Sequence, residues 1–235
     1  MPQKRENNLE ATVLQQKMTT EYVPQTDRST LTYVVEDVAV GGSAWYRFWK
    51  RLFDLVVSIL AGVVLLVPML IIGVMIRLDS AGPAIYRQER LGKNGKPFVL
   101  YKFRSMHQNA EQNGPQWAKV RDQRCTRLGK ILRASRVDEL PQLWNIFKGE
   151  MSFVGPRPER SCFYEEFETY IHGFSKRMQV RPGLTGLAQI NGGYDLKPEE
   201  KIVYDMQYIK NRSLKLDLKC IFGTTKLVFT HKGAR

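Results

Sequence analysis

The sequence has few of the residues on which disulfide frameworks, zinc sites and histidine-based catalysis depend. Its three cysteines are odd in number and widely spaced, and its three histidines are scattered. These patterns fit neither a disulfide framework nor a zinc site, and they disfavour a histidine triad. They favour a reducing, cytosolic setting instead. The N-terminus also lacks the charged-then-apolar opening of a signal peptide.

Acidic residues are in the minority, and the charge is unevenly distributed. The formal net charge is +13; residues 1–45 contribute −2, with four Lys/Arg against six Asp/Glu, so residues 46–235 contribute +15. Such an excess attracts nucleic acid, anionic lipid or phosphorylated metabolites. Because no RNA-binding signature, zinc finger or recognition-helix pattern is present, we expect no nucleic-acid partner.

Composition divides the chain into three parts. Residues 1–45 are polar, end at Gly41-Gly42, and predict a flexible tail with one short strand at Leu31–Val35. Residues 46–80 contain an apolar segment. Residues 81–235 have the mixed composition of a folded domain, for which we predict an α/β fold that is mainly helical.

The apolar segment is a run of 22 residues without a formal charge, Leu55–Ile76. As a helix it would be roughly 33 Å long, enough to cross a hydrocarbon core of about 30 Å. Pro68 lies near its middle and predicts a kink. Basic residues flank both ends, whereas a simple crossing places the positive excess on one side. A helix that enters the membrane, bends at Pro68 and returns to the same face satisfies both observations; a full crossing and a buried core helix are the alternatives.

Two strands are predicted next, Ala84–Arg90 and Pro97–Met106, joined through an Asn-Gly turn at Lys93–Lys96. Basic and aromatic residues alternate along the second strand. This period of two places Lys102 and Arg104 on one face of the strand. Both are candidate phosphate ligands.

A segment with two adjacent acids follows a short predicted helix, Thr126–Arg133. We expect a further helix to begin near Asp138, because Pro141 is tolerated only in a first turn, and to end at Gly149. Its apolar stripe is Leu140, Leu143, Trp144 and Phe147. Asp138 and Glu139 then lie at a helix N-terminus, where negative charge is favoured and phosphate can bind. An ordinary acidic N-cap is the simpler alternative.

Three arginines lie in or beside constrained segments: Arg133, Arg157 within Phe153–Pro158, and Arg181 within Val180–Gln189. Guanidinium groups suit bidentate phosphate binding. Diphosphate chemistry also needs a divalent cation, and Mg²⁺ takes one or two carboxylates plus substrate oxygens. The acid pair can divide this work, with one carboxylate attacking phosphorus and the other holding the metal.

The C-terminal part of the domain interleaves apolar residues with lysines from Leu214 to Lys232. This pattern predicts an amphipathic helix, either lying on an anionic membrane surface or packed on the core with a solvated basic face. A shorter helix is predicted at Glu159–Tyr170.

Five motifs occur in a fixed order along the chain: Arg51-Leu52-Phe53-Asp54, Tyr101-Lys102-Phe103-Arg104-Ser105-Met106, Asp138-Glu139-Leu140-Pro141-Gln142-Leu143, Phe153-Val154-Gly155-Pro156-Arg157-Pro158-Glu159 and Arg181-Pro182-Gly183-Leu184-Thr185-Gly186. Together they closely resemble the bacterial sugar transferase family, the monotopic polyprenyl-phosphate phosphoglycosyl transferases. The resemblance covers roughly residues 46–235. The chain resembles the short form, without the several-helix membrane domain of larger relatives.

The resemblance implies transfer of a sugar-1-phosphate from a nucleoside-diphosphate sugar, expected to be UDP-linked, to undecaprenyl phosphate, with release of UMP. This would initiate exopolysaccharide, capsule or other glycan assembly on the cytoplasmic face of a bacterial cell membrane. Implied partners are the two substrates, membrane lipid, and other polysaccharide-assembly proteins or a second copy of the chain. The implied fold is a compact, mainly helical α/β catalytic domain with a β-hairpin and an N-terminal re-entrant membrane helix.

The resemblance also implies roles for individual residues. Asp138 corresponds to the nucleophile that forms a covalent phosphosugar intermediate, and Glu139 to the Mg²⁺ ligand. Arg133, Arg157 and Arg181 correspond to arginines that contact phosphate. Pro68 corresponds to the break in the re-entrant helix, although Val67 replaces the serine that often precedes it.

Two other functions compete with this interpretation. A magnesium-dependent hydrolase of nucleotide sugars would use water in place of the lipid phosphate. A non-catalytic membrane anchor of a polysaccharide-assembly complex would have no need of the acid pair and the three arginines.

Overall fold

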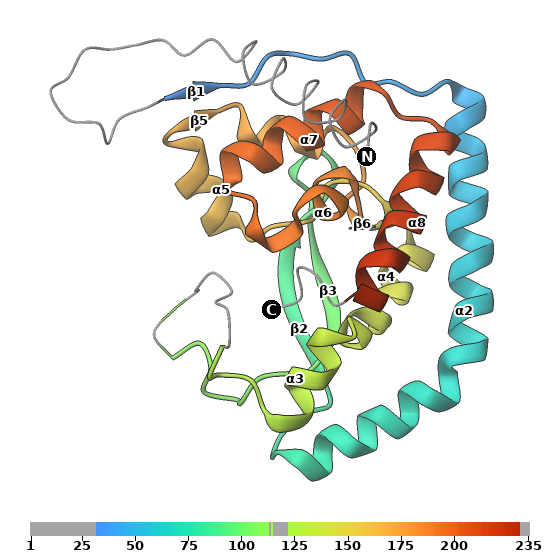
Figure 1. Cartoon of the computed structure of the whole chain (residues 1–235), viewed down its shortest axis with the longest axis vertical. Coiled ribbons are helices and arrows are strands. Elements are labelled where there is room, and N and C mark those ends of the chain that lie inside the picture. The colour runs from blue at the N-terminus through green and yellow to red at the C-terminus, as the bar shows by residue number, and fades with distance from the viewer. Residues whose placement is uncertain (1–31, 113, 115–121, 231–235) are drawn as a thin grey trace, which may run out of the picture.

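The computed structural model describes residues 32–112, 114 and 122–230, which form a mainly helical body with small sheets. A long helix lies along one edge of the body, and a two-stranded ribbon runs through its middle (Figure 1). The predicted α/β, mainly helical class is confirmed at this level. Most of the predicted tail, residues 1–31, lies outside the described residues.

Helix α2 (Ala44–Asp79) contains the whole uncharged run. It begins after Ser43, whose side chain accepts a hydrogen bond from the backbone N–H of Tyr46 at 3.1 Å. Among the described residues it is the one helix that is long and apolar enough to cross a membrane, judged by length and composition. Only 6% of its most apolar window is buried, so the alternative of a buried core helix is wrong.

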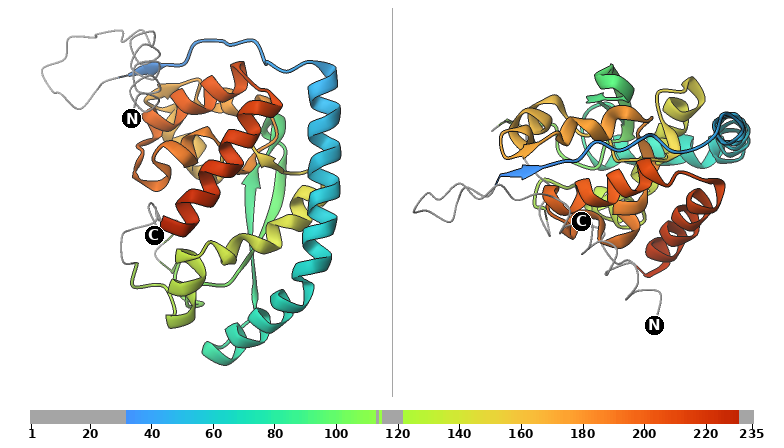
Figure 2. Two further views of the ribbon diagram at one scale, coloured as in Figure 1. Left: turned by 45° about the vertical axis from the view of Figure 1, so that its right-hand side comes forward. Right: turned by 90° about the horizontal axis from the view of Figure 1, so that it is seen from above.

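Helix α2 is bent. Figure 2 shows a straight part beside the body and a shorter C-terminal part that turns beneath α3 (Arg127–Ala134). Pro68 lies inside the helix, and a proline there removes a backbone hydrogen bond and crowds the carbonyl one turn earlier. The bend therefore agrees with the kink predicted at Pro68.

One turn of α2 attaches the helix to the body through two polar side chains. The guanidinium of Arg51 donates to two carbonyl oxygens near the end of α4 (Leu143–Lys148), both at 2.8 Å. These bonds satisfy acceptors that a helix C-terminus leaves unpaired. The buried carboxylate of Asp54 accepts from the Ser152 hydroxyl and from the following backbone N–H in β4 (Ser152–Val154), both at 3.1 Å.

Strands β2 (Ile85–Leu91) and β3 (Pro97–Phe103) pair antiparallel over their whole lengths. The short 3-10 turn η1 (Lys93–Gly95) connects them, and Asn94 and Gly95 both have positive φ. Asparagine and glycine tolerate this conformation best, which is why the Asn-Gly pair predicted the turn. Strand β3 ends three residues before its predicted end.

The acidic segment differs from the prediction. Helix α3 begins after Thr126, whose hydroxyl accepts a backbone N–H of the first turn at 2.9 Å. The chain then forms a 3-10 turn, η2 (Val137–Gln142), before α4 ends at Gly149 in the left-handed conformation. Asp138 therefore lies in a 3-10 turn and not at the start of an α-helix, because Pro141 has no N–H to donate and regular α-helix begins after it.

The apolar stripe predicted for this segment is divided between core and surface. Leu143 is buried and Leu140 packs against the core. Trp144 and Phe147 are 54% and 37% exposed, and their rings stack with centroids 5.3 Å apart. Because α2 packs against α4, these rings extend the apolar surface of α2.

Two glycine-containing loops pack backbone to backbone next to the parallel pair of β4 and β6 (Gly183–Thr185). A Cβ added at Gly183 would lie 2.1 Å from the backbone nitrogen of Gly155. Close approach therefore requires glycine here. The packing joins the loop that contains Arg157 to the loop that contains Arg181.

The remaining elements build the largest core cluster. Those that contribute side chains are β1 (Tyr33–Val34), α5 (Ser161–Glu168), β5 (Ile171–His172), η3 (Phe174–Gln179), α6 (Leu187–Asn191), α7 (Pro198–Lys210) and α8 (Leu214–Thr230), and the short turn η4 (Gly193–Asp195) lies between α6 and α7. Strand β1 pairs in parallel with β5. Side chains at most 1% exposed fill the cluster, among them Ile171, Phe174, Ile202, Ile209 and Cys220.

Helix α8 has two apolar faces. Cys220 is fully buried, so one face packs on the core, as one alternative predicted. On the outward face Leu214, Leu218 and Phe222 are 44%, 48% and 69% exposed. Their four-residue spacing makes one exposed apolar stripe, and a position of this helix on a membrane surface stays a prediction.

Candidate active site

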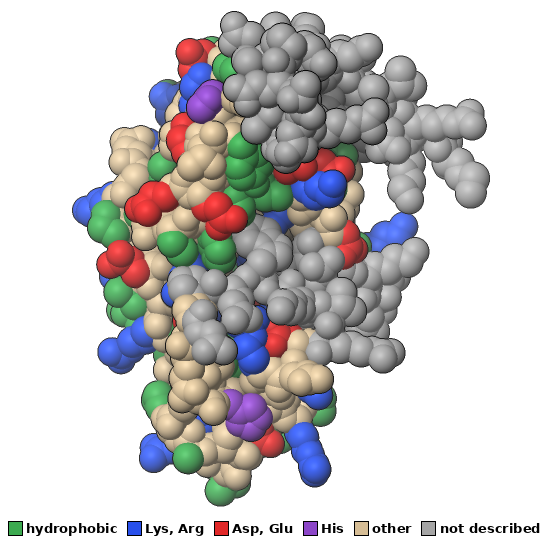
Figure 3. Space-filling view, turned by 90° about the vertical axis from the view of Figure 1, so that its left-hand side faces the viewer, with side chains coloured by type: hydrophobic (Ala, Val, Ile, Leu, Met, Phe, Trp, Pro, Cys, Tyr) green, Lys and Arg blue, Asp and Glu red, His purple; other side chains and the backbone are tan. Residues whose placement is uncertain are grey.

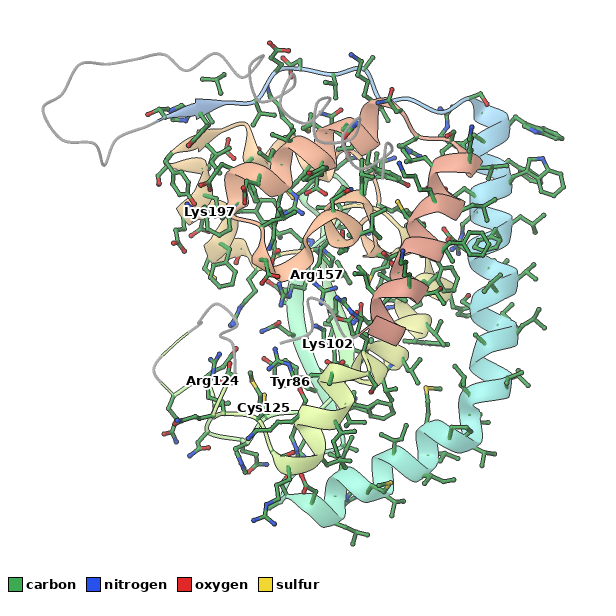
Figure 4. The ribbon with its side chains drawn as sticks, in the orientation of Figure 1. Tyr86, Lys102, Arg124, Cys125, Arg157 and Lys197 are labelled. Carbon is green, nitrogen blue, oxygen red and sulfur yellow. The ribbon has the colours of Figure 1, made fainter. Side chains whose placement is uncertain are left out.

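A cavity of about 930 Å³ lies beside the ribbon of β2 and β3. Its walls are the ribbon, the loop after β3, the segment from α3 to η2, and the loop between β4 and α5. Figure 4 labels four of the lining residues: Tyr86 and Lys102 on the ribbon, Arg157, and Arg124 on the loop that faces the ribbon. A cavity of this size suits a nucleotide-sized ligand.

Asp138 and Glu139 are each only 7% exposed, but their surroundings differ. Asp138 lines the cavity and Glu139 does not. The Oε1 of Glu139 instead accepts a hydrogen bond from the Arg157 guanidinium and lies 3.8 Å from the Nζ of Lys102. The 3-10 turn thus directs one acid to the ligand space and the other to two cations.

These contacts make the two acids electrostatically unequal. Burial and the neighbouring Glu139 raise the pKa of Asp138 to about 6, against the lowering effect of Lys102, Arg133 and Arg157. Burial also acts to raise the pKa of Glu139, but Arg157 and Lys102 outweigh it and hold that pKa below its usual range. The sequence led us to expect that arginines and a helix N-terminus keep Asp138 ionised. Desolvation raises the pKa instead, but a pKa of about 6 still leaves most of Asp138 ionised at neutral pH, as expected.

Four of the five basic residues that we predicted as phosphate ligands line the cavity: Lys102, Arg104, Arg133 and Arg157. Three of them act on the charge of Asp138. The guanidinium of Arg133 also lies 3.1 Å from the sulfur of Cys125. The predicted alternation of β3, with Lys102 and the following Arg104 on one face, agrees with this arrangement.

Arg104 has a structural duty that the sequence did not indicate. It is 6% exposed, and its Nη2 donates to the carbonyl oxygens of Ile76 and Ser80 at 3.2 and 2.6 Å and to the Ser80 hydroxyl at 3.0 Å. It therefore satisfies the C-terminal end of α2. Its other nitrogens Nε and Nη1 have no hydrogen-bond partner within the described part of the chain.

Arg181 does not line the cavity. Its side chain is exposed, and the charged groups that act on it are Arg51, Asp54 and Arg212. The loop packing brings its backbone close to that of the Arg157 loop but directs the side chain toward the N-terminal part of α2. The structure thus does not bring Arg181 together with the other four predicted cations.

A buried ion pair that the sequence analysis did not predict holds the backbone of Arg157 in place. Arg177 and Asp205 are both about 1% exposed, 2.6 Å apart. The Nη2 of Arg177 also donates to the backbone oxygen of Arg157 at 3.0 Å. The pair therefore fixes the backbone from which Arg157 reaches Glu139.

Lys201 and Glu159, both buried and both on the cavity wall, were missed as well. Glu159 is paired with Arg90 at 3.2 Å. One signal was available in the sequence: Lys201 and Asp205 are four residues apart in an otherwise apolar face of α7, and charges are rarely buried without a partner.

The acid pair offers two carboxylates, and Mg²⁺ often takes only one or two from a protein. Among the described residues no group of three or more His, Cys, Asp or Glu side chains is placed to hold a metal. Mg²⁺ needs fewer, because phosphate oxygens and water complete its shell around one or two carboxylates. The low pKa of Glu139 keeps a hard, charged oxygen donor next to Asp138.

Comparison with known proteins identifies the family. The model of the bacterial sugar transferase family matches residues 45–231, which include α2, the cavity and the acid pair. The chain belongs to the bacterial sugar transferase family. The motifs on which the resemblance rested thus lie within the matched part of this sugar transferase.

Named relatives agree with this assignment. A UDP-N-acetylgalactosamine-undecaprenyl-phosphate N-acetylgalactosaminephosphotransferase of Aeromonas hydrophila is 44% identical over 193 residues, which are 81% of this chain and 46% of the relative. A UDP-glucose:undecaprenyl-phosphate glucose-1-phosphate transferase of Klebsiella pneumoniae is 42% identical over 191 residues, 79% of this chain and 41% of the relative.

A putative undecaprenyl-phosphate N-acetylgalactosaminyl 1-phosphate transferase of Bacillus subtilis (strain 168) is 48% identical over 137 residues, 58% of this chain and 76% of the relative. This sugar transferase spans less than half the length of the first two relatives. Two of these three names give N-acetylgalactosamine and one gives glucose.

The difference between the pKa values of the two acids leads to a prediction about Asp138. Replacing Glu139 by Gln removes the charge that raises the pKa of Asp138 and releases Arg157 and Lys102 to act on Asp138 alone. We expect the pKa of Asp138 to fall below its wild-type value, measured by titrating the ¹³C-labelled Asp138 carboxyl by NMR. Arg157→Gln should shift the same pKa upward. A pKa that is unchanged or higher in Glu139→Gln would show that desolvation alone sets it.

Proposed function

We propose that this sugar transferase moves a sugar-1-phosphate from a UDP-sugar to undecaprenyl phosphate, releasing UMP, and thereby initiates glycan assembly. The observation that supports it most is the position of Asp138: a buried carboxylate at the wall of a nucleotide-sized cavity, with Lys102, Arg133 and Arg157 around it. The names of the relatives supply the substrate class. Because these names give different sugars, the proposal assigns none.

In the first half-reaction, the Asp138 carboxylate attacks the phosphorus that bears the sugar. A bond forms between its oxygen and phosphorus, the bond from that phosphorus to the bridging oxygen breaks, and its electron pair leaves with UMP. Lys102, Arg133 and Arg157 offset the negative charge of the phosphates, which otherwise repel a carboxylate. Burial of Asp138 leaves it poorly solvated and close to the reacting atom, which favours attack.

In the second half-reaction, the phosphate oxygen of undecaprenyl phosphate attacks the same phosphorus. The bond to Asp138 breaks, its electron pair returns to the carboxylate, and undecaprenyl-diphosphate-sugar forms. A covalent intermediate lets a soluble donor and a lipid acceptor use one site in turn. The hydrolase alternative differs in this step alone, since water would replace the lipid phosphate.

We propose that Glu139 would hold Mg²⁺ through its Oε2, because Arg157 and Lys102 both contact its Oε1. Bound there, the ion would neutralise charge on the diphosphate and polarise it. The contribution of the protein is to keep Glu139 ionised through Arg157 and Lys102. Chelation by EDTA should therefore stop UMP release, and added Mg²⁺ should restore it; release that persists in EDTA contradicts the assignment.

We further propose that α2 enters the cytoplasmic leaflet and returns. Both ends of α2 are hydrogen-bonded to the same body, through Arg51 near one end and through the Ile76 and Ser80 oxygens that Arg104 holds at the other. A helix that crossed the bilayer would place one end about 30 Å away on the far side. The bend at Pro68 supports the return.

The distribution of surface residues supports the same orientation. The outward side chains of α2 are large and apolar, with Val63, Val64 and Val67 each more than 60% exposed, and the stripe of α8 continues this surface. Figure 3 shows Lys, Arg, Asp and Glu side chains over the face opposite α2. Trp45 and Trp49 at the start of α2 suit the membrane–water interface.

The chemistry is tested with Asp138→Asn. This variant should release no UMP from any UDP-sugar, because an amide is not a nucleophile, whereas Asp79→Asn, an exposed acid of α2, should behave as wild type. Mass spectrometry of donor-treated wild type should show a phosphosugar adduct on Asp138. The wild-type rate should fall as the pH drops below about 6, where the raised pKa leaves Asp138 protonated. Substantial turnover by Asp138→Asn would remove it from the nucleophile role.

The topology is tested by cysteine labelling from one side of the membrane. Ala44→Cys and Lys93→Cys place thiols at exposed positions, one at the first residue of α2 and one beyond its C-terminal end. Both should react only from the cytoplasmic side in the re-entrant arrangement, and the unsubstituted chain gives the background. Pro68→Leu should shift part of the population to opposite-side labelling, since 22 apolar residues can cross a bilayer. Opposite-side labelling of the unmutated helix would contradict re-entry but leave the reaction untouched.

A further inference from the structure

A second, smaller pocket adjoins the cavity next to Arg157. Four cationic side chains line it, Arg136, Arg157, Arg177 and Lys201, and its lining contains no acidic side chain. Arg157 and Lys201 line both spaces, so the pocket adjoins the cavity, and Arg157 connects it to the acid pair through its contact with Glu139. Its volume is about 20 Å³, room for one group of the size of a water molecule or a phosphate oxygen.

Two buried side chains of the pocket have polar atoms that find no partner among the residues that the structure describes. Gln189 is 6% exposed, and neither atom of its amide is paired. Arg177 is 2% exposed, and its Nε and Nη1 are unpaired although its Nη2 binds Asp205. Buried polar groups are nearly always paired in native proteins. Of the four unpaired atoms on these two lining residues, three are nitrogen donors and one is an oxygen acceptor, so a ligand that supplies oxygen acceptors completes the pocket.

Arg136, another residue of the pocket lining, has a strained backbone conformation. Arg136 has φ 57 and lies directly before η2, two residues ahead of Asp138. A residue other than glycine rarely adopts this left-handed conformation, and such strain concentrates at functional sites. The same turn that directs Asp138 into the large cavity therefore also supplies a guanidinium to the small pocket.

We propose that the small pocket is a second phosphate subsite, which receives an oxygen of the phosphate on the far side of the bond that Asp138 breaks. The proposal rests on the proposed function. In the first half-reaction this is the phosphate that leaves with the nucleoside. In the second it is the acceptor's phosphate, because the incoming nucleophile takes the position that the leaving group vacated. Cations fixed there stabilise the charge that develops on the leaving oxygen.

The experiment compares UMP with uridine, which lacks the phosphate, as ligands of the full chain in detergent. Wild type should bind UMP at least about tenfold more tightly than uridine, as expected when charge-assisted hydrogen bonds to phosphate form. Arg136→Asn should reduce this ratio by about tenfold, since asparagine tolerates the left-handed backbone but has no charge. Arg136→Lys should restore part of it.

The matched control is Arg127→Asn, which removes the same charge from an exposed arginine at the start of α3. Equal falls in the two Asn variants, an unchanged ratio in Arg136→Asn, or equal binding of UMP and uridine by wild type would each overturn the subsite. Failure of the proposed function has a different signature. If no UDP-sugar yields UMP while the ratios behave as expected, the phosphate subsite stands and the transfer reaction falls.

Discussion

The ion pair between Arg157 and Glu139 is the constraint on which the site depends. It joins the loop after β4 to the turn before α4, two segments that α4 and β4 separate in the sequence. By occupying Glu139 it leaves Asp138 as the acid that lines the cavity. It also separates the pKa values of the two acids, because Arg157 acts more strongly on the carboxylate that it touches. Without this contact the two buried acids would have more similar pKa values and would be less suited to different roles.

Helix α2 is attached to the same elements. Arg51 and Asp54, one turn apart on α2, bind the end of α4 and the start of β4 respectively. These are the elements that flank the acid pair and the Arg157 loop. At the other end of α2, Arg104 reaches from β3 into the helix C-terminus while also lining the cavity. A shift of α2 in the lipid would therefore move the walls of the site, which couples the proposed lipid chemistry to the position of the helix.

Electrostatics and solvation oppose each other throughout the site. The chain has a formal net charge of +13, yet burial is strong enough to raise the pKa of Asp138 despite three nearby cations. A carboxylate that is desolvated but still ionised near neutral pH is a reactive one, and the cations that keep it charged are those that attract phosphate. The buried pair of Arg177 and Asp205 extends this arrangement behind Arg157. The substrate phosphates of the proposed reaction would add negative charge to this cluster of cations.

Local patterns in the sequence determined much of this molecule. The uncharged run with Pro68 predicted a long apolar helix with a bend, the Asn-Gly pair predicted the turn of the ribbon, and the period of β3 placed Lys102 beside Arg104. The order of the motifs determined the family. Only the tertiary structure decided which acid faces the cavity, that Arg181 points elsewhere, and that Arg177 and Asp205 meet in the core. The reason is physical: these outcomes depend on contacts between segments distant in sequence and on desolvation, which neighbouring residues along the chain do not encode.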